Sequence, residues 1–176
     1  SETGRVVLEY EDFETGMGNW INLSSGDTHD WIRDSGGTPS SSTGPAAGAL
    51  SSTWYMYLEA ADASVSGNTA VLEGPSMDGT ARELTFYYHM YGSNMGTLNV
   101  DVYSSGSWTN GIWSRTGQQH TSNGAAYTKA AVNLNAYTGT IKIRFRAVAA
   151  GGSKGDMAID KIEITKDAEG ESLILN

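Results

Sequence analysis

Apolar and polar residues alternate with a period of two along most of the chain. In residues 83–92 (ELTFYYHMYG), large apolar side chains stand at every second position up to Met90. Residues 97–104 (TLNVDVYS) and 140–148 (TIKIRFRAV) alternate in the same way. This period is typical of antiparallel strands that bury one face and expose the other.

The remainder of the chain repeats short segments of this kind, separated by Gly, Ser, Asn or Asp. No segment shows a convincing helical period. Ten or so short strands without helices predict an all-β fold, a two-sheet antiparallel β-sandwich of the jelly-roll type. The further strands are expected at Arg5–Glu14, Asn19–Leu23, His29–Asp34, Trp54–Ala60, Asn68–Glu73, Gly111–Thr116, Ala125–Leu134 and Asp156–Thr165.

The last expected strand contains an irregularity. Met157 and Ile159 set one face, whereas Ile162 and Ile164 are out of phase with them by one residue. A β-bulge near Asp160–Lys161 would bring both pairs to the core side of the sheet. The bulge would also redirect the side chain of the aspartate.

Length, charge and cysteine content narrow the classes of function. A chain of 176 residues fits one domain, expected at residues 1–166, with a C-terminal tail or linker at 167–176. The net charge of -9, with 11 Lys and Arg residues, argues against a nucleic-acid partner. No apolar stretch reaches the length of a membrane span, so no membrane insertion is expected. The chain has no cysteine, which excludes disulfides and zinc–thiolate sites.

The short motifs, taken in order, resemble the MAM domain, an extracellular jelly-roll module named from meprin, A5 antigen and receptor phosphatase mu. The resemblance covers about residues 5–166. Its most specific parts are FYYHMYG with MGTLNV, and the closing GDMAIDKI. The other parts are DFE, GNW, DWIRDSGGTPSSSTGP, WYMYLEA, AVLEGP, IWSRTGQQ and KAAVNL.

The chain also departs from animal MAM domains, which usually carry disulfides and often an Asp-His pair after the TGP stretch. Here there is no cysteine, and AAGAL follows TGP. Both departures resemble a bacterial, cysteine-free branch. That resemblance implies a non-catalytic recognition or adhesion module, secreted or at the cell surface, in a larger bacterial protein. The expected partners are a protein or glycan ligand and an attached catalytic domain; the alternative is a carbohydrate-binding module of a secreted hydrolase.

A structural calcium ion is expected from the same resemblance, because related jelly rolls hold a cation where the first and last strands meet a long loop. Calcium takes six to eight oxygen ligands. The candidate ligands are Glu14, Asp30 and Asp160, with Asp27 or Thr43 as additions. In the alternative interpretation, these are strand-end and turn residues that bond nearby amides.

A polar, aromatic ligand face is the second candidate site. Tyr87, His89 and Tyr91 are expected on the outward side of one strand, and Asp101 and Tyr103 on the outward side of the next. If those strands pair, their side chains form one platform on which sugar rings could stack. The alternative is that these residues belong to a second buried layer at an edge of the sandwich, or make ordinary cross-strand pairs.

The tryptophans divide into two groups. Trp20, Trp31 and Trp113 fall in strand patterns, so core packing is expected. Trp54 and Trp108 follow the turn-rich segments LSST and SSGS and are the better candidates for exposed contacts.

No motif supports catalysis. The three histidines are scattered, and the sequence has neither an H-E-x-x-H zinc motif nor a G-x-S-x-G nucleophile elbow. His29 is adjacent to Asp30, but neighbouring side chains in a strand point to opposite faces. We therefore expect a protein that is not an enzyme.

Overall fold

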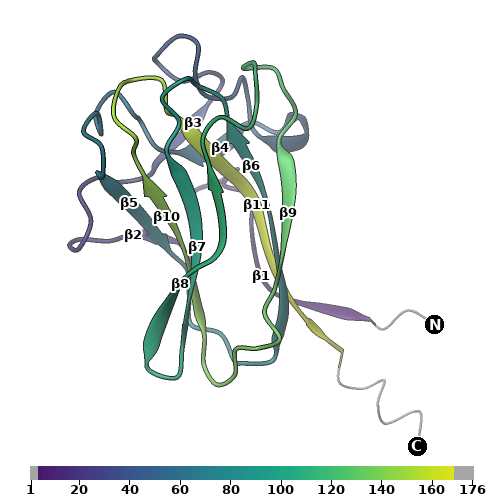
Figure 1. The fold of residues 1–176 in the computed structure, drawn as a ribbon. Helices are drawn as coiled ribbons and strands as arrows, with labels where there is room; N and C mark the ends of the chain where they lie inside the picture. Colours follow the sequence, from purple (N-terminus) through teal and green to yellow (C-terminus); the bar gives the residue numbers. More distant parts are fainter. Residues whose placement is uncertain (1–3, 169–176) are drawn as a thin grey trace, which may run out of the picture.

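The computed structural model describes residues 4–168 as two packed antiparallel sheets, a jelly-roll β-sandwich (Figure 1). One sheet has the order β3-β4-β11-β6-β9, with β1 also paired to β11; the other has the order β2-β5-β10-β7-β8. The expected fold class is therefore confirmed. The strands are β1 (Arg5–Glu11), β2 (Ile21–Asn22), β3 (Ile32–Ser35), β4 (Trp54–Tyr57), β5 (Thr69–Glu73), β6 (Ala81–Met90), β7 (Thr97–Ser104), β8 (Ser107–Thr116), β9 (Thr128–Asn133), β10 (Lys142–Val148) and β11 (Met157–Asp167).

Within residues 4–168, the one helical element is a 3-10 turn at Ala49–Ser51. No helix in this part of the chain has the length and apolar character needed to cross a membrane. β11 runs to Asp167, one residue into the expected tail, and residues 169–176 lie outside the described part.

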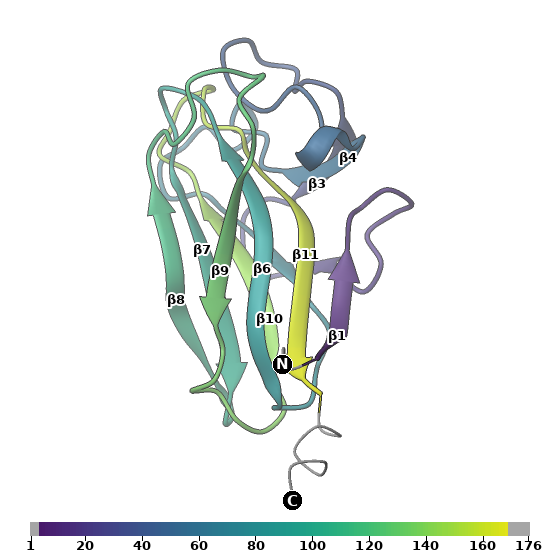
Figure 2. The same cartoon turned by 90° about the vertical axis from the view of Figure 1, so that its right-hand side faces the viewer.

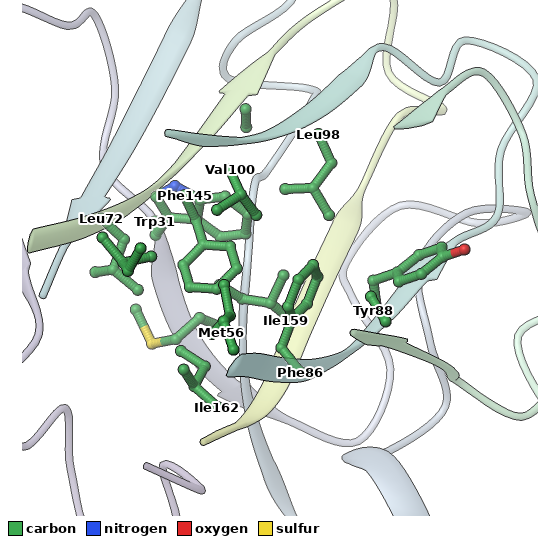
Figure 3. Close-up of a cluster of buried hydrophobic side chains, with 14 of the residues drawn as sticks. Trp31, Met56, Leu72, Phe86, Tyr88, Leu98, Val100, Phe145, Ile159 and Ile162 are labelled. Carbon is green, nitrogen blue, oxygen red and sulfur yellow. The ribbon is translucent and has the colours of Figure 1, made fainter. Parts of the chain in front are cut away.

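The core lies between the two sheets and is built from the alternating apolar positions. Phe86, Val100 and Phe145 come from three different strands and meet there, with the rings of Phe86 and Phe145 4.9 Å apart (Figure 3). Trp20 and Trp31 are buried as expected, and Trp31 donates its indole N–H to the carbonyl of Ala70 at 2.9 Å. Burial of these side chains holds the two sheets face to face.

β11 occupies a central position in its sheet. One of its edges pairs with β6; the other is shared between β4 near its start and β1 near its end (Figure 2). The predicted bulge is confirmed: the pairing with β6 shifts register between Asp160 and Glu163, and Lys161 has a φ of 48°. Ile162 and Ile164 consequently reach the core.

The start of β8 differs from the expectation. The strand begins at Ser107 rather than Gly111, because Ser105 and Gly106 form a two-residue hairpin with φ values of 54° and 85°. Positive φ at both central residues is the geometry of the turns that fit the twist of a hairpin. The hairpin places Trp108 opposite Tyr103 on the neighbouring strand.

The geometry of the bulge predicts how substitutions at position 161 change the stability of the domain. A left-handed residue other than glycine costs about 1–2 kcal/mol, and a β-branched residue tolerates it worst. We expect Lys161→Val to lower the free energy of unfolding by about 1–2 kcal/mol. We expect Lys161→Gly to change it by less than about 0.5 kcal/mol, because relief of strain offsets the entropy of glycine.

Urea denaturation followed by tryptophan fluorescence measures both variants. In a regular strand the order would be reversed, since valine favours strands and glycine does not. A Val variant more stable than the Gly variant would therefore contradict the bulge.

Candidate functional site

Two of the expected metal ligands, Glu14 and Asp160, bind the same short segment, residues 49–54. The Glu14 carboxylate accepts hydrogen bonds from two consecutive N–H groups of this segment, at 2.9 and 2.6 Å. The Asp160 carboxylate accepts one from another N–H of the segment at 2.8 Å and one from the Ser52 hydroxyl at 3.1 Å. Burial nevertheless raises the pKa of Asp160 to about 6.

The other three expected ligands lie elsewhere. Asp27 accepts an N–H of β5, in the other sheet, at 2.8 Å, and Asp30 is exposed. The Thr43 hydroxyl donates to the Tyr91 carbonyl at 2.8 Å and accepts the Asp156 N–H at 2.9 Å. Across residues 4–168, no group of three or more His, Asp or Glu side chains could hold a metal ion. The five residues therefore do not form one site.

Asp156 is a buried acid to which the sequence analysis gave no role. Its Oδ1 accepts the N–H of Ala60 at 2.8 Å, whereas its Oδ2 is buried without a hydrogen-bond partner in the described part of the chain. Burial raises the pKa of Asp156 to about 6. The sequence signal was an aspartate immediately before the buried strand β11.

The polar loop between β3 and β4 is held mainly by hydrogen bonds to its neighbours. The Asn123 side chain donates to the carbonyls of Thr43 and Gly44 at 3.0 and 2.8 Å, and the Tyr127 hydroxyl donates to Ala47 at 2.9 Å. A hollow of about 370 Å³ on this loop is lined by small polar residues, prolines and Asn123. It lacks aromatic and charged side chains, so it offers a ligand few anchors.

The expected ligand platform does not form. Its two strands, β6 and β7, lie in different sheets, because the connection at residues 91–96 crosses from one sheet to the other. The platform is therefore a correction to the sequence analysis: Tyr87, His89 and Tyr91 lie apart from Asp101 and Tyr103. Asp101 and Tyr103 stand at alternate positions of β7, on one side of the five-stranded sheet.

His89 stands on the outward side of its strand, opposite Ala158, but it is fully buried there. Its ring stacks on His120 at 4.7 Å and 5°, and Tyr127 covers it at 5.3 Å. Neither ring nitrogen of His89 has a hydrogen-bond partner among the described residues. Burial, followed by the charge of His120, lowers the pKa of His89 to about 4.

The outward side of the five-stranded sheet carries the most developed side-chain cluster. Tyr103 and Trp108 meet across the β7–β8 hairpin with ring centroids 5.4 Å apart. The Arg144 guanidinium lies 4.0 Å from the Trp108 ring, and the Lys142 ammonium lies 5.0 Å from the Tyr103 ring. We call the surface formed by Tyr103, Trp108, Asn110, Lys142, Arg144 and Arg146 the Trp108 face.

Asp101 lies beneath the Trp108 face and is fully buried. It accepts hydrogen bonds from Arg144 at 2.7 Å and from Arg146 at 2.8 and 3.1 Å, and a third donor is the N–H of Gly111 at 2.8 Å. Burial alone would raise the pKa of Asp101, but the hydrogen bonds from Arg146 and Arg144 outweigh it and hold the pKa below its usual range. The carboxylate is therefore charged at neutral pH and fixes both guanidinium groups.

In the described residues, none of the three histidines hydrogen-bonds a carboxylate, so no histidine–acid pair for general-base chemistry is assembled. Sequence reasoning placed Asp101 and Tyr103 on the exposed face and singled out Trp108, but missed Arg144 and Arg146. The available signal was the alternation of basic residues in IKIRFR opposite the lone acid of LNVDV.

A family model and a known relative both match this chain to the same family. The family model described as "MAM domain, meprin/A5/mu" matches residues 12–168. The mouse MAM domain-containing glycosylphosphatidylinositol anchor protein 2 is 31% identical over 191 residues, which cover 96% of this chain and 19% of that protein. The chain thus spans about a fifth of the length of that relative.

Solved structures show the same fold at low sequence identity. The K1 cleaved adhesin domain of Lys-gingipain from Porphyromonas gingivalis superposes with a TM-score of 0.61 at 21% identity, covering 94% of this chain and 99% of that one. A carbohydrate-binding module described for mannan recognition has a TM-score of 0.57 at 12% identity, covering 94% and 99%. At these identities the likeness shows the fold alone.

The burial of His89 predicts a pH dependence of stability. Its pKa is lower in the folded chain than the unfolded value near 6.5, so the unfolded chain binds more protons between pH 6.5 and 4. The contribution of His89 to the free energy of unfolding is therefore present above pH 6.5 and is lost as the pH falls toward 4. The loss between pH 7 and 4.5 is about 2 kcal/mol.

Urea denaturation of the wild type and of His89→Phe at both pH values isolates this effect, since phenylalanine keeps the ring stacking. The acids with raised pKa values act in the opposite direction but equally in both proteins. We expect the variant to lose less stability on acidification than the wild type. Equal losses would contradict the assignment.

Proposed function

The chain belongs to the MAM domain family, and on that premise we propose that it is a non-catalytic recognition or adhesion module of a larger secreted or cell-surface protein. Two findings support this proposal: the name of its mouse relative describes a membrane-anchored protein, and the chain spans a fifth of that relative. The absence of cysteine supports a parent from the bacterial, cysteine-free branch. An attached catalytic domain stays a prediction about that parent.

One observation carries the proposal: the Trp108 face is an ordered cluster of aromatic, cationic and amide side chains at the surface of a sheet. Tryptophan, tyrosine and arginine are the side chains that most often dominate binding energy at recognition surfaces. Asp101 fixes the two arginines here before any ligand arrives, which lowers the entropic cost of binding. A glycan, as the ligand of a carbohydrate-binding module, is the alternative to a protein ligand.

Binding and turnover assays on the same preparation test this function. We expect the isolated domain to bind members of a combined glycan and extracellular-protein array in a saturable manner. We also expect it to leave polysaccharide and peptide substrates uncleaved. Cleavage that persists through purification, or an array without any binding, would contradict the recognition role.

We also propose a structural calcium ion, restricted to Glu14 and Asp160. Both carboxylates meet the 49–54 segment, and burial of the Asp160 charge is a cost that a cation would offset. The present donors to these carboxylates are N–H groups and a hydroxyl, so calcium binding requires the segment to turn carbonyl oxygens toward the ion.

Thermal denaturation in EDTA and in millimolar calcium tests this ion. We expect calcium to raise the melting temperature of the wild type and to have no effect on Asp160→Asn. The exposed Asp30→Asn serves as the control and should respond as the wild type does. A wild-type midpoint that is the same in EDTA and in calcium would rule out the ion.

A further inference from the structure

The charges of this acidic protein are distributed unevenly along the chain. Between Glu83 and Asp156 the sequence contains six Lys and Arg residues but a single acid, Asp101. The rest of the chain contains 19 of the 20 acids and five of the 11 Lys and Arg residues. This cationic segment forms β7, β8, β9 and β10 and most of β6.

The cations of this segment gather on the five-stranded sheet. Lys142, Arg144 and Arg146 stand at alternate positions of β10, on the same side as Asp101 and Tyr103 of β7. The acids near them are Asp101, fully buried below, and Glu73, which lies 3.7 Å from Lys142. Three cations against two acids leave the Trp108 face with an excess of positive charge.

The face is also ordered by hydrogen bonds. The Arg144 guanidinium bonds Asp101 through Nε and Asn110 through Nη2, at 2.7 and 3.0 Å, and its carbon lies 4.0 Å from the centre of the Trp108 ring. Along the same sheet, the Ser114 hydroxyl donates to Asn99 at 3.0 Å. Aromatic rings, fixed guanidinium groups and side-chain amides thus follow one another across β8, β7 and β10.

We propose that the Trp108 face binds an acidic polysaccharide. The Trp108 ring stacks on a sugar ring, and Tyr103, whose ring is inclined at 63° to that of Trp108, contacts the edge of the sugar. Arg144 and Arg146 bind its carboxylate or sulfate group, and Asn110 bonds hydroxyl groups. Guanidinium suits this role because its planar donors match the two oxygens of a carboxylate. This inference rests on the proposed recognition function and names the ligand class of that same surface.

Other polymers fit the face less well. The centre of a protein interface is enriched in aromatic residues and arginine but is usually apolar and depleted in lysine, whereas the Trp108 face contains Lys142 and no aliphatic residue. A nucleic acid needs phosphate contacts from many Lys and Arg residues, and the chain has 11 of them in a net charge of -9. A uronic acid or sulfated sugar needs one anion-binding group beside a stacking ring. Arg144 and Trp108 provide this pair, with the guanidinium 4.0 Å from the ring.

Affinity gel electrophoresis of the whole chain tests the proposal. The gels contain polygalacturonate or alginate as carboxylated polymers, dextran sulfate as a sulfated polymer, and xylan or galactomannan as neutral polymers. We expect retardation on a carboxylated or the sulfated polymer, and the polymer that retards identifies the anion. Affinity should fall by about tenfold or more in Trp108→Ala and in Arg144→Gln.

Matched variants distinguish specific binding at the Trp108 face from nonspecific electrostatic attraction. Lys129→Gln, on β9 of the other sheet, removes the same charge as Arg144→Gln and should bind as the wild type does. Trp108→Phe keeps an aromatic ring and should retain more affinity than Trp108→Ala. Arg144→Gln leaves Asp101 paired with Arg146 and Gly111, so its fold should persist, and thermal denaturation verifies this.

Three outcomes would overturn the inference: no retardation on any acidic polymer, equal weakening by Lys129→Gln, or tighter binding to single-stranded DNA than to the polysaccharides. If the domain instead binds a neutral glycan or a protein on the array, the acidic ligand is refuted and the recognition function stands. If it binds nothing on gels or array, both fail.

Discussion

A single buried carboxylate, that of Asp101, organises the exposed side of the five-stranded sheet. It accepts hydrogen bonds from two guanidinium groups and one backbone N–H, and it is fully shielded from solvent. Removing one partner of a buried ion pair typically costs about 3–5 kcal/mol, so the arginines around a buried acid are held firmly. Arg144, which Asp101 fixes in this way, lies over Trp108, and the β7–β8 hairpin holds Trp108 against Tyr103. The acid and the hairpin together set the geometry of the Trp108 face.

The acids of the other sheet have a different role. Glu14 and Asp160 are bonded to the 49–54 segment, and Asp156 receives the N–H of Ala60. These contacts tie the long connections to β11, the strand that pairs with β1, β4 and β6. The bulge at Lys161 allows β11 to bury its isoleucines while Asp160 turns to that segment. The buried acids near β11 therefore hold loops, whereas the buried Asp101 holds two arginines at the surface of the other sheet.

The periodicity of the sequence was sufficient to predict the fold class, most strands and the bulge, because each depends on which side chains alternate within one segment. It was insufficient to predict which strands pair with each other. Residues 83–92 and 97–104 follow each other closely, yet the short connection crosses between sheets, and this separates Tyr87 from Tyr103. The burial of His89 likewise depends on Tyr127, a residue distant in sequence. The contacts that define the candidate site are long-range, and a single sequence does not encode them in its local pattern.

We infer that this MAM domain recognises its ligand with a sheet face rather than with its loops. An NMR titration of the 15N-labelled chain with an acidic oligosaccharide tests this inference. We expect the Trp108 indole N–H and the backbone amides of β7, β8 and β10 to shift together, in a saturable way. Shifts confined to the polar loop at residues 36–47, with the Trp108 indole unmoved, would contradict it.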